Sequence, residues 1–182
     1  MTALPPPDLL QCYWVVPGRF LAGEYPAHMD RPLVGERLDA LVQAGLDTFF
    51  DLTERGELEP YLPTLQARAG AQGRTVSQHR FPIADFGLPR PEQMRALLDA
   101  IDSALAEGRN LYVHCWGGIG RTGMTVACYL VRHGLDGAAA LEQIAAWRAA
   151  LPGSRFYPRS PETQEQVEFV QTWSESPRLR QE

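Results

Sequence analysis

The stretch "LYVHCWGGIGRTG", residues 111–123, decides the fold class of this chain. It opens with an apolar run typical of a buried strand, passes through a glycine-rich turn and continues into a helical pattern. A strand, a glycine-rich turn and a helix in this order point successive backbone N–H groups at one spot, where the positive end of the helix dipole also lies. The stretch therefore predicts a loop that binds an anion.

On either side of this stretch, predicted strands alternate with predicted helices. Strands are expected within residues 13–26, as a pair around a Pro-Gly turn, and within 47–52, 75–83 and 110–115. Helices are expected within 33–44, 60–72, 91–108, 121–134, 136–151 and 160–173, the last with Ser160 as its N-cap. The alternation favours an α/β fold with a central, mostly parallel sheet of four to five strands flanked by helices.

The composition fits a single globular domain over residues 1–182, with a proline-rich arm at residues 1–12. A formal net charge of -5 gives the chain no general attraction for nucleic acid. The sequence lacks the pattern of a signal peptide or of a membrane span. Three cysteines without zinc-site spacing favour a reducing compartment, so we predict a cytoplasmic protein with no metal, no cofactor and no membrane partner.

Cys115 lies at the mouth of the glycine-rich turn, where the N–H groups that bind an anion also stabilise a thiolate. We expect it to be an exposed nucleophile. The glycines permit positive φ angles and a close approach of the ligand. Arg121 offers two parallel donors to phosphate oxygens, and the hydroxyl of Thr122 is expected to reach the sulfur. The residues expected to bind the anion are Trp116, Gly117, Gly118, Ile119, Gly120 and Arg121.

The string His, Cys, five residues, Arg, Thr resembles the active-site loop of the cysteine-dependent dual-specificity and tyrosine protein phosphatases. Three segments, "RGELEPYLPTL" (55–65), "PIADFGLP" (82–89) and "HCWGGIGR" (114–121), are similar to the kinase-associated phosphatase branch of that family. The resemblance implies the dual-specificity phosphatase fold, a phosphorylated protein or peptide as substrate, and catalysis without a metal.

A phosphatase of this kind needs an acid, because an expelled alkoxide is a poor leaving group unless it is protonated. Asp85 is the leading candidate, since it lies between two prolines in "FPIADFGLPRP" and Gly87 beside it provides a hinge. Asp51 and Glu54, which follow an earlier predicted strand, are the competing carboxylates. For these two we expect a structural or substrate-contact role.

Several neighbouring residues have two open interpretations. His114 either orients the backbone of the cysteine or packs as a core histidine, and Trp116 either touches substrate or packs beside the loop. Cys128 is expected in the core and Cys12 at the surface, with a protective disulfide to Cys115 as the less favoured alternative.

The segment "PETQEQ", residues 161–166, departs from the classical tyrosine phosphatases. In those relatives a glutamine that heads a "T-x-x-Q" helix positions the hydrolytic water, and Glu162 stands at the matching place here. The role of this end of the chain in catalysis is therefore open. Gln166 is expected to be structural.

The predicted function is hydrolysis of phosphotyrosine, with some phosphoserine or phosphothreonine, through a cysteinyl-phosphate intermediate. The segment "WGGIG", residues 116–120, holds no lysine, which disfavours phosphoinositides. The alternatives are a phospho-binding module without catalysis, a phosphatase for a non-protein phosphate ester, and an arsenate reductase or rhodanese-like thiol enzyme. The last two thiol enzymes would not need Asp85 or Thr122.

Overall fold

The computed structural model describes residues 7–27 and 33–175. Its centre is a five-stranded sheet with the strand order β1-β2-β5-β3-β4. β1 (Cys12–Val16) pairs antiparallel with β2 (Phe20–Gly23), and the remaining neighbours pair in parallel: β5 (Leu111–His114), β3 (Thr48–Asp51) and β4 (Ser77–Arg80). The predicted mostly parallel sheet is confirmed.

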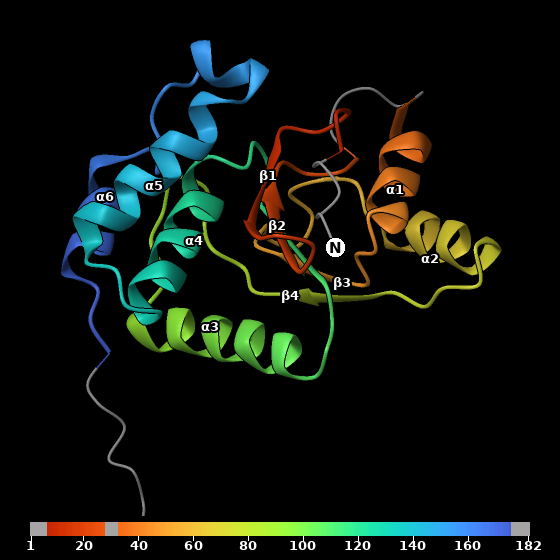
Figure 1. The fold of residues 1–182 in the computed structure, drawn as a ribbon, viewed down its shortest axis with the longest axis horizontal. Helices are drawn as coiled ribbons and strands as arrows, with labels where there is room; N and C mark the ends of the chain where they lie inside the picture. Colours follow the sequence, from red (N-terminus) through yellow and green to blue (C-terminus); the bar gives the residue numbers. More distant parts are fainter. Residues whose placement is uncertain (1–6, 28–32, 176–182) are drawn as a thin grey trace, which may run out of the picture.

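Helices cover both faces of the sheet (Figure 1). One face packs against α1 (Val34–Gln43) and α2 (Leu62–Ala71). The other packs against α3 (Pro91–Ala106), α4 (Gly120–Arg132), α5 (Gly137–Ala149) and α6 (Gln164–Thr172). A short 3₁₀ helix, η2 (Pro152–Arg155), follows α5.

The two layers of helices follow from the alternation of side chains along the strands. In β5, Leu111 and Val113 belong to the apolar cluster under α3 to α6, whereas Tyr112 between them belongs to the cluster under α1 and α2. Phe50 and Phe49 in β3 divide in the same way. The inner strands β5 and β3 are therefore buried on both faces, as parallel sheets with crossover helices require, whereas β4 at the sheet edge is partly exposed.

Two expectations near the chain ends are wrong. Cys12 begins β1 and is 1% exposed, because its side chain packs into the cluster beneath α1 and α2, so the arm ends before it. Half of the predicted arm, residues 1–6, lies outside the described residues. Ser160 does not cap the last helix, because its hydroxyl donates instead to the carbonyl of Ile119 at 2.6 Å. Thr163 is the N-cap, and α6 begins one residue later.

The carboxyl ends of the parallel strands lie together along one edge of the sheet. At this edge the chain leaves β5 and passes through the glycine-rich turn into α4. Asp51 and His114 are partners in the register of β3 and β5, so both lie at that edge. Ligands in open α/β sheets bind outside the carboxyl ends of the strands. The sheet therefore places Cys115, the first residue after β5, where a ligand is expected.

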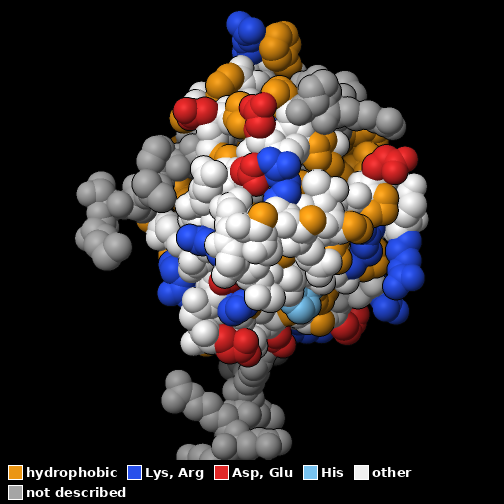
Figure 2. Space-filling view, turned by 90° about the vertical axis from the view of Figure 1, so that its right-hand side faces the viewer, with side chains coloured by type: hydrophobic (Ala, Val, Ile, Leu, Met, Phe, Trp, Pro, Cys, Tyr) orange, Lys and Arg blue, Asp and Glu red, His pale blue; other side chains and the backbone are white. Residues whose placement is uncertain are grey.

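On the face covered by α1 and α2, basic and acidic side chains are interspersed with uncharged ones (Figure 2). The described side chains on this face form no stripe of basic residues of the kind that tracks a nucleic-acid backbone. Among the residues that the structure describes, no helix is both long and apolar enough to cross a membrane.

Candidate active site

The glycine-rich turn, residues 115–121, is called the phosphate loop below. It packs against the end of β2, where the backbone N–H of Tyr25 donates to the carbonyl of Trp116 at 2.7 Å. Gly118 has a φ of 68°, and a Cβ at this position would overlap the backbone of Gly23. Only glycine meets both requirements. Gly117 and Gly120, for which we also expected positive φ angles, do not have them.

The backbone donors of the phosphate loop match those of an anion site. The N–H of Gly123 donates to the carbonyl of Ile119 at 3.2 Å and closes the first turn of α4. The N–H groups of residues 117–122 have no hydrogen-bond partner among the described residues. Free N–H groups at a helix N-terminus bind anions, and the dipole of α4 adds to the attraction.

Cys115 lies on the floor of a cleft with a volume of about 460 Å³. The thiol is not exposed as we expected, because the residue is only 3% accessible and packs against the core beneath the loop. The residues that line this cleft are Gln11, Glu24, Asp85, Phe86, Cys115, Trp116, Gly117, Ile119, Gly120, Arg121, Arg148, Gly153, Phe156, Tyr157, Glu162 and Gln166.

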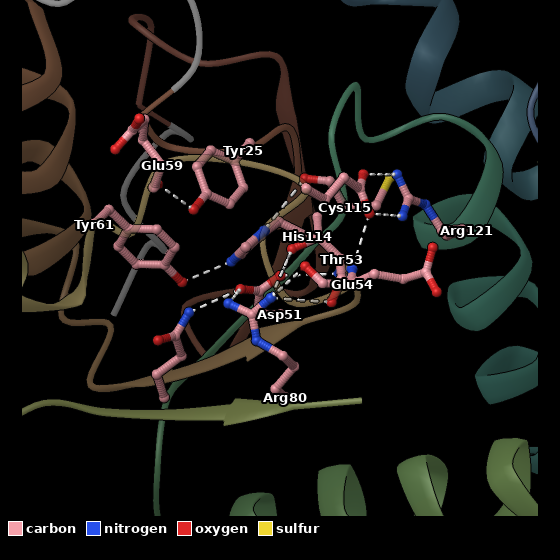
Figure 3. A network of polar contacts seen from close by, with 12 residues as sticks. Tyr25, Asp51, Thr53, Glu54, Glu59, Tyr61, Arg80, His114, Cys115 and Arg121 are labelled. Carbon is pink, nitrogen blue, oxygen red and sulfur yellow. Dashed lines mark hydrogen bonds and ion pairs between the residues drawn. The ribbon is translucent and has the colours of Figure 1, made fainter. Parts of the chain in front are cut away.

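Arg121 is buried beside the thiol, and its guanidinium group forms several hydrogen bonds and ion pairs (Figure 3). Its Nη1 and Nη2 donate to the two carboxylate oxygens of Glu57 at 2.8 and 2.6 Å. Nη1 also donates to the carbonyl of Ile83 at 3.1 Å, and Nη2 lies 3.0 Å from Oδ1 of Asp85. Burial alone would lower the pKa of Arg121, but the bonds to Glu57 and the nearby negative groups outweigh it and raise the pKa.

Asp85 stands on the acid loop, as residues 82–89 between β4 and α3 are called here. Its side chain is 42% exposed and lines the same cleft as Cys115. Phe86 beside it has a φ of 56°, a left-handed conformation that costs a non-glycine residue about 1 to 2 kcal/mol. The loop is attached to the sheet by the N–H of Ile83, which donates to the carbonyl of Leu52 at 3.0 Å.

Glu57 is a carboxylate of the cleft region that the sequence analysis missed. We weighed Asp51 and Glu54 as carboxylates of this segment, but the one that reaches the phosphate loop is Glu57, in the middle of "RGELEPY". Partial burial raises the pKa of Glu57, but the bonds from Arg121 outweigh it, so the pKa lies below its usual value. The carboxylate is therefore charged at neutral pH.

Asp51 has a structural role. Its carboxylate is fully buried and accepts hydrogen bonds from the backbone and hydroxyl of Thr53, at 2.9 and 2.6 Å, and from Gln78. Arg80 pairs with it at 2.8 Å. Glu54 is exposed, and its backbone N–H donates to Glu57.

His114 is fully buried and lies between Tyr61 and the backbone of Cys115 (Figure 3). Its Nδ1 is 3.3 Å from the carbonyl of Cys115, which only accepts, so the proton is assigned to Nδ1. Nε2 then accepts from the hydroxyl of Tyr61 at 2.6 Å. Burial lowers the pKa of His114 from 6.5 to about 4, so the ring is neutral at neutral pH. Both ring nitrogens are therefore engaged, and the Nδ1 proton holds the backbone carbonyl of Cys115.

Other predicted residues have mixed outcomes. The hydroxyl of Thr122 is buried without a hydrogen-bond partner among the described residues, so the expected contact with the sulfur is not formed. Trp116 is 41% exposed and lines the cleft. Cys12, Cys115 and Cys128 are all free thiols. Burial raises the pKa of Cys12 to about 12 and that of Cys128 still further, so both are protonated at neutral pH.

Residues of α5 and of the segment that leads into α6 also line the cleft. Glu162 lies there, and burial together with the nearby charge of Asp85 raises its pKa. Arg148, on α5, is 4% exposed and donates to the carbonyl of Gly118 at 3.2 Å. We did not anticipate Arg148, because nothing in "AAWRAAL" distinguishes it from a solvent-facing helix residue. Within residues 7–27 and 33–175, no group of His, Cys, Asp or Glu side chains could hold a metal ion.

Comparisons with known proteins agree with this fold and loop. A family model described as "PTP-SAK: Swiss Army Knife protein, DSP-PTPase phosphatase domain" matches residues 10–170. The chain therefore belongs to this family of dual-specificity and tyrosine phosphatase domains.

Three of the similar proteins illustrate the match. Human cyclin-dependent kinase inhibitor 3 is 31% identical over 94 residues, which cover 51% of this chain and 43% of the human protein. The solved kinase-associated phosphatase has a TM-score of 0.62 at 24% identity, covering 83% of each chain. The solved Tk-PTP in its active form has a TM-score of 0.64 at 28% identity, covering 88% of this chain and 93% of that one. The predicted similarity to the kinase-associated branch is confirmed, although the matched stretch spans less than half of the human relative.

Proposed function

We propose that this phosphatase domain hydrolyses phosphate monoesters of proteins, with phosphotyrosine as the leading substrate. The observation that carries the proposal is the cleft in which Cys115, Arg121 and Asp85 meet, although these residues come from two loops. A phospho-binding module without catalysis would not need this full set. An arsenate reductase or rhodanese-like enzyme would not need Asp85.

The proposed first step is attack by the Cys115 thiolate on phosphorus. The phosphate oxygens are held by the N–H groups of the phosphate loop and by Arg121. Phosphate that binds Arg121 replaces Asp85 at Nη2, because Glu57, Ile83 and Asp85 already engage both Nη atoms. The ester P–O bond breaks as the S–P bond forms, and Asp85 gives its proton to the leaving oxygen.

The proposed second step returns the enzyme to its starting state. Asp85, now ionised, takes a proton from water, and the resulting hydroxide attacks phosphorus. The S–P bond breaks, which releases inorganic phosphate and the thiolate of Cys115. No metal takes part, since Arg121 and the loop N–H groups balance the charge of the transferred group.

Aromatic side chains around the cleft support an aryl ester as the substrate. Trp116, Phe86, Phe156 and Tyr157 line the cleft, and each is between 41% and 68% exposed. Exposed rings of this kind stack on another ring with offset or edge-to-face geometry.

A non-protein phosphate ester is the second candidate, favoured by the charge of Arg148 near the loop. Glu24 and Glu162 line the same cleft, however, and their charges repel a substrate with several phosphates.

The test is hydrolysis of phosphotyrosine peptides by the purified protein in the presence of a metal chelator. We expect turnover that vanadate inhibits and that Cys115→Ser abolishes. A parallel panel of phosphoserine peptides, phosphoinositides and nucleotides ranks the substrate classes. Full activity in Cys115→Ser would overturn the mechanism, and preference for a nucleotide or lipid would overturn the protein substrate.

A further inference from the structure

The acid loop is held at two carbonyls, one on each side of Asp85. The carbonyl of Ile83, two residues before it, accepts from Nη1 of Arg121 at 3.1 Å. The carbonyl of Gly87, two residues after it, accepts from Nε2 of Gln166 at 3.2 Å. Both donors are buried, Arg121 at 2% exposure and Gln166 at 0%.

Gln166 is itself fixed against the phosphate loop. Its Oε1 accepts from the backbone N–H groups of Glu162 and Thr163, at 3.1 and 3.4 Å. It also lies close to Gly120, where an added Cβ would come within 2.9 Å of Oε1. One amide group therefore touches the start of α6, the start of α4 and the acid loop. These hydrogen bonds fix the orientation of the amide group, because Oε1 faces two donors and Nε2 faces an acceptor.

The second half of the acid loop depends on this contact. The N–H of Gly87 donates to the carbonyl of Ala84 at 2.8 Å, but that bond lies within the loop and does not join it to the catalytic cleft. Phe86, between Asp85 and Gly87, holds its left-handed conformation while 59% exposed. Strained backbone of this kind persists only where its surroundings hold it on both sides.

We infer that Gln166 is a positioning residue for the general acid: through the carbonyl of Gly87 it sets where Asp85 stands over the phosphate loop. The inference rests on the proposed function, in which Asp85 protonates the leaving oxygen. It gives Gln166 a role in catalysis beyond the structural one expected from the sequence. Gln166 acts only through Asp85 and does not touch the reacting atoms.

The test compares two substrates that differ in their need for an acid. Phenyl phosphate has a leaving oxygen that must be protonated, whereas 2,4-dinitrophenyl phosphate expels a stable anion. In Gln166→Glu one carboxylate oxygen still accepts from the N–H groups of Glu162 and Thr163, but the amide nitrogen that donates to the carbonyl of Gly87 is replaced by an oxygen that cannot donate. We expect kcat/KM to fall about tenfold for phenyl phosphate and less than about twofold for the dinitrophenyl ester. Gln166→Met, an uncharged variant that also lacks the donor, is expected to do the same.

Two controls separate positioning from loss of structure. Thr163→Ala removes the hydroxyl that caps α6 through the N–H of Gln166, at 3.2 Å, but leaves the bond to Gly87 in place. It is expected to lower the melting temperature without distinguishing the two substrates. If the Gln166 variants do not fold, Gly87→Ala carries the same test, because its Cβ would press on Ala84 at 3.0 to 3.1 Å and shift the loop from the other side of the bond.

The decisive comparison repeats Gln166→Glu in the Asp85→Asn background. There the effect on phenyl phosphate should disappear, because a residue that acts through Asp85 has nothing left to position. An equal loss on both substrates, or an undiminished loss without Asp85, would overturn the inference while leaving the proposed function intact. Absence of Cys115-dependent hydrolysis by the wild-type protein would remove the proposed function and this inference together.

Discussion

The two sides of Cys115 differ in charge and in burial. On the side of the sheet, His114 and Tyr61 are neutral, fully buried and bonded to each other, and His114 supports the backbone of Cys115. On the side of the cleft, Arg121 is paired with Glu57 and with the partly exposed Asp85. We therefore interpret the sheet side as the structural support of Cys115 and the cleft side as the place of the proposed reaction. We expect changes on the sheet side to alter stability, and changes on the cleft side to alter turnover.

Apart from the loss of Cys115 itself, the largest effect is expected from Asp85→Asn on the cleft side. Removing a general acid costs about 100-fold in rate for a substrate whose leaving group must be protonated. The melting temperature should hardly change, because the side chain is 42% exposed. Steady-state kinetics with phenyl phosphate measure the first effect and thermal unfolding the second. If Asp85→Asn kept the wild-type rate but had a much lower melting temperature, the cleft side would be structural, which contradicts this comparison.

The next effect lies on the sheet side and depends on pH. Because the pKa of His114 is about 4 in the folded protein and 6.5 when the ring is exposed, the unfolded chain binds a proton first as pH falls. The free energy of unfolding therefore keeps its full value above pH 6.5. It decreases by about 3 kcal/mol as the pH falls from 6.5 to about 4.

Urea unfolding at several pH values checks this prediction. His114→Gln should lose that part of the pH dependence, although the variant is less stable throughout. His79→Gln, at an exposed position of β4, is the matched control and should keep it. The same pH dependence in wild type and His114→Gln would contradict a buried neutral ring.

A smaller effect on turnover is expected from Glu57→Gln. The amide keeps one acceptor for Arg121 but loses the charge and the second acceptor, so the guanidinium is held less firmly against the phosphate oxygens. We expect kcat/KM to fall about tenfold, with little change in stability, because Arg121 retains Asp85 and the carbonyl of Ile83. Glu54→Gln is the control, since that exposed side chain belongs to the same segment. Equal losses in both variants would show that the segment matters and Glu57 does not.

The smallest effect is expected from Tyr61→Phe. The change leaves Nε2 of His114 buried without its donor, which costs about 1 to 2 kcal/mol of stability. Turnover should stay within about threefold of wild type, because no group that contacts phosphate changes. Tyr25→Phe is a matched control, since that hydroxyl donates to the carbonyl of Glu59, at 2.7 Å, and not to His114. A large loss of turnover with unchanged stability would show that the sheet side takes part in the chemistry.

The fold and the centre of the site follow from local patterns in the sequence. Alternating strands and helices, with a glycine-rich turn after a buried strand, are enough to predict the sheet and the place of Cys115. The role of Ser160 was not predictable from its neighbours, because its hydroxyl bonds to Ile119, which is distant in sequence. The choice of helix cap depended on that tertiary contact.

The residues that surround Cys115 required the structure. Glu57 stands among several acidic residues in its segment, and only the packing of that segment against α4 brings it to Arg121. Arg148 lies on a helix whose pattern does not reveal that one basic side chain turns inward. The burial of Cys115 was missed for a related reason. The sequence of the loop does not show that residues from distant segments of the chain line the cleft around the thiol.

The central claim is that the thiol of Cys115 carries the phosphoryl group. The most direct measurement is rapid acid quenching of Asp85→Asn during turnover of 2,4-dinitrophenyl phosphate, followed by mass spectrometry of its peptides. This substrate needs no acid for the first step, while the second step lacks its base, so the intermediate should accumulate. We predict one phosphoryl group on the peptide that contains Cys115. Turnover with no phosphorylated Cys115, or with the group on another residue, would contradict the account.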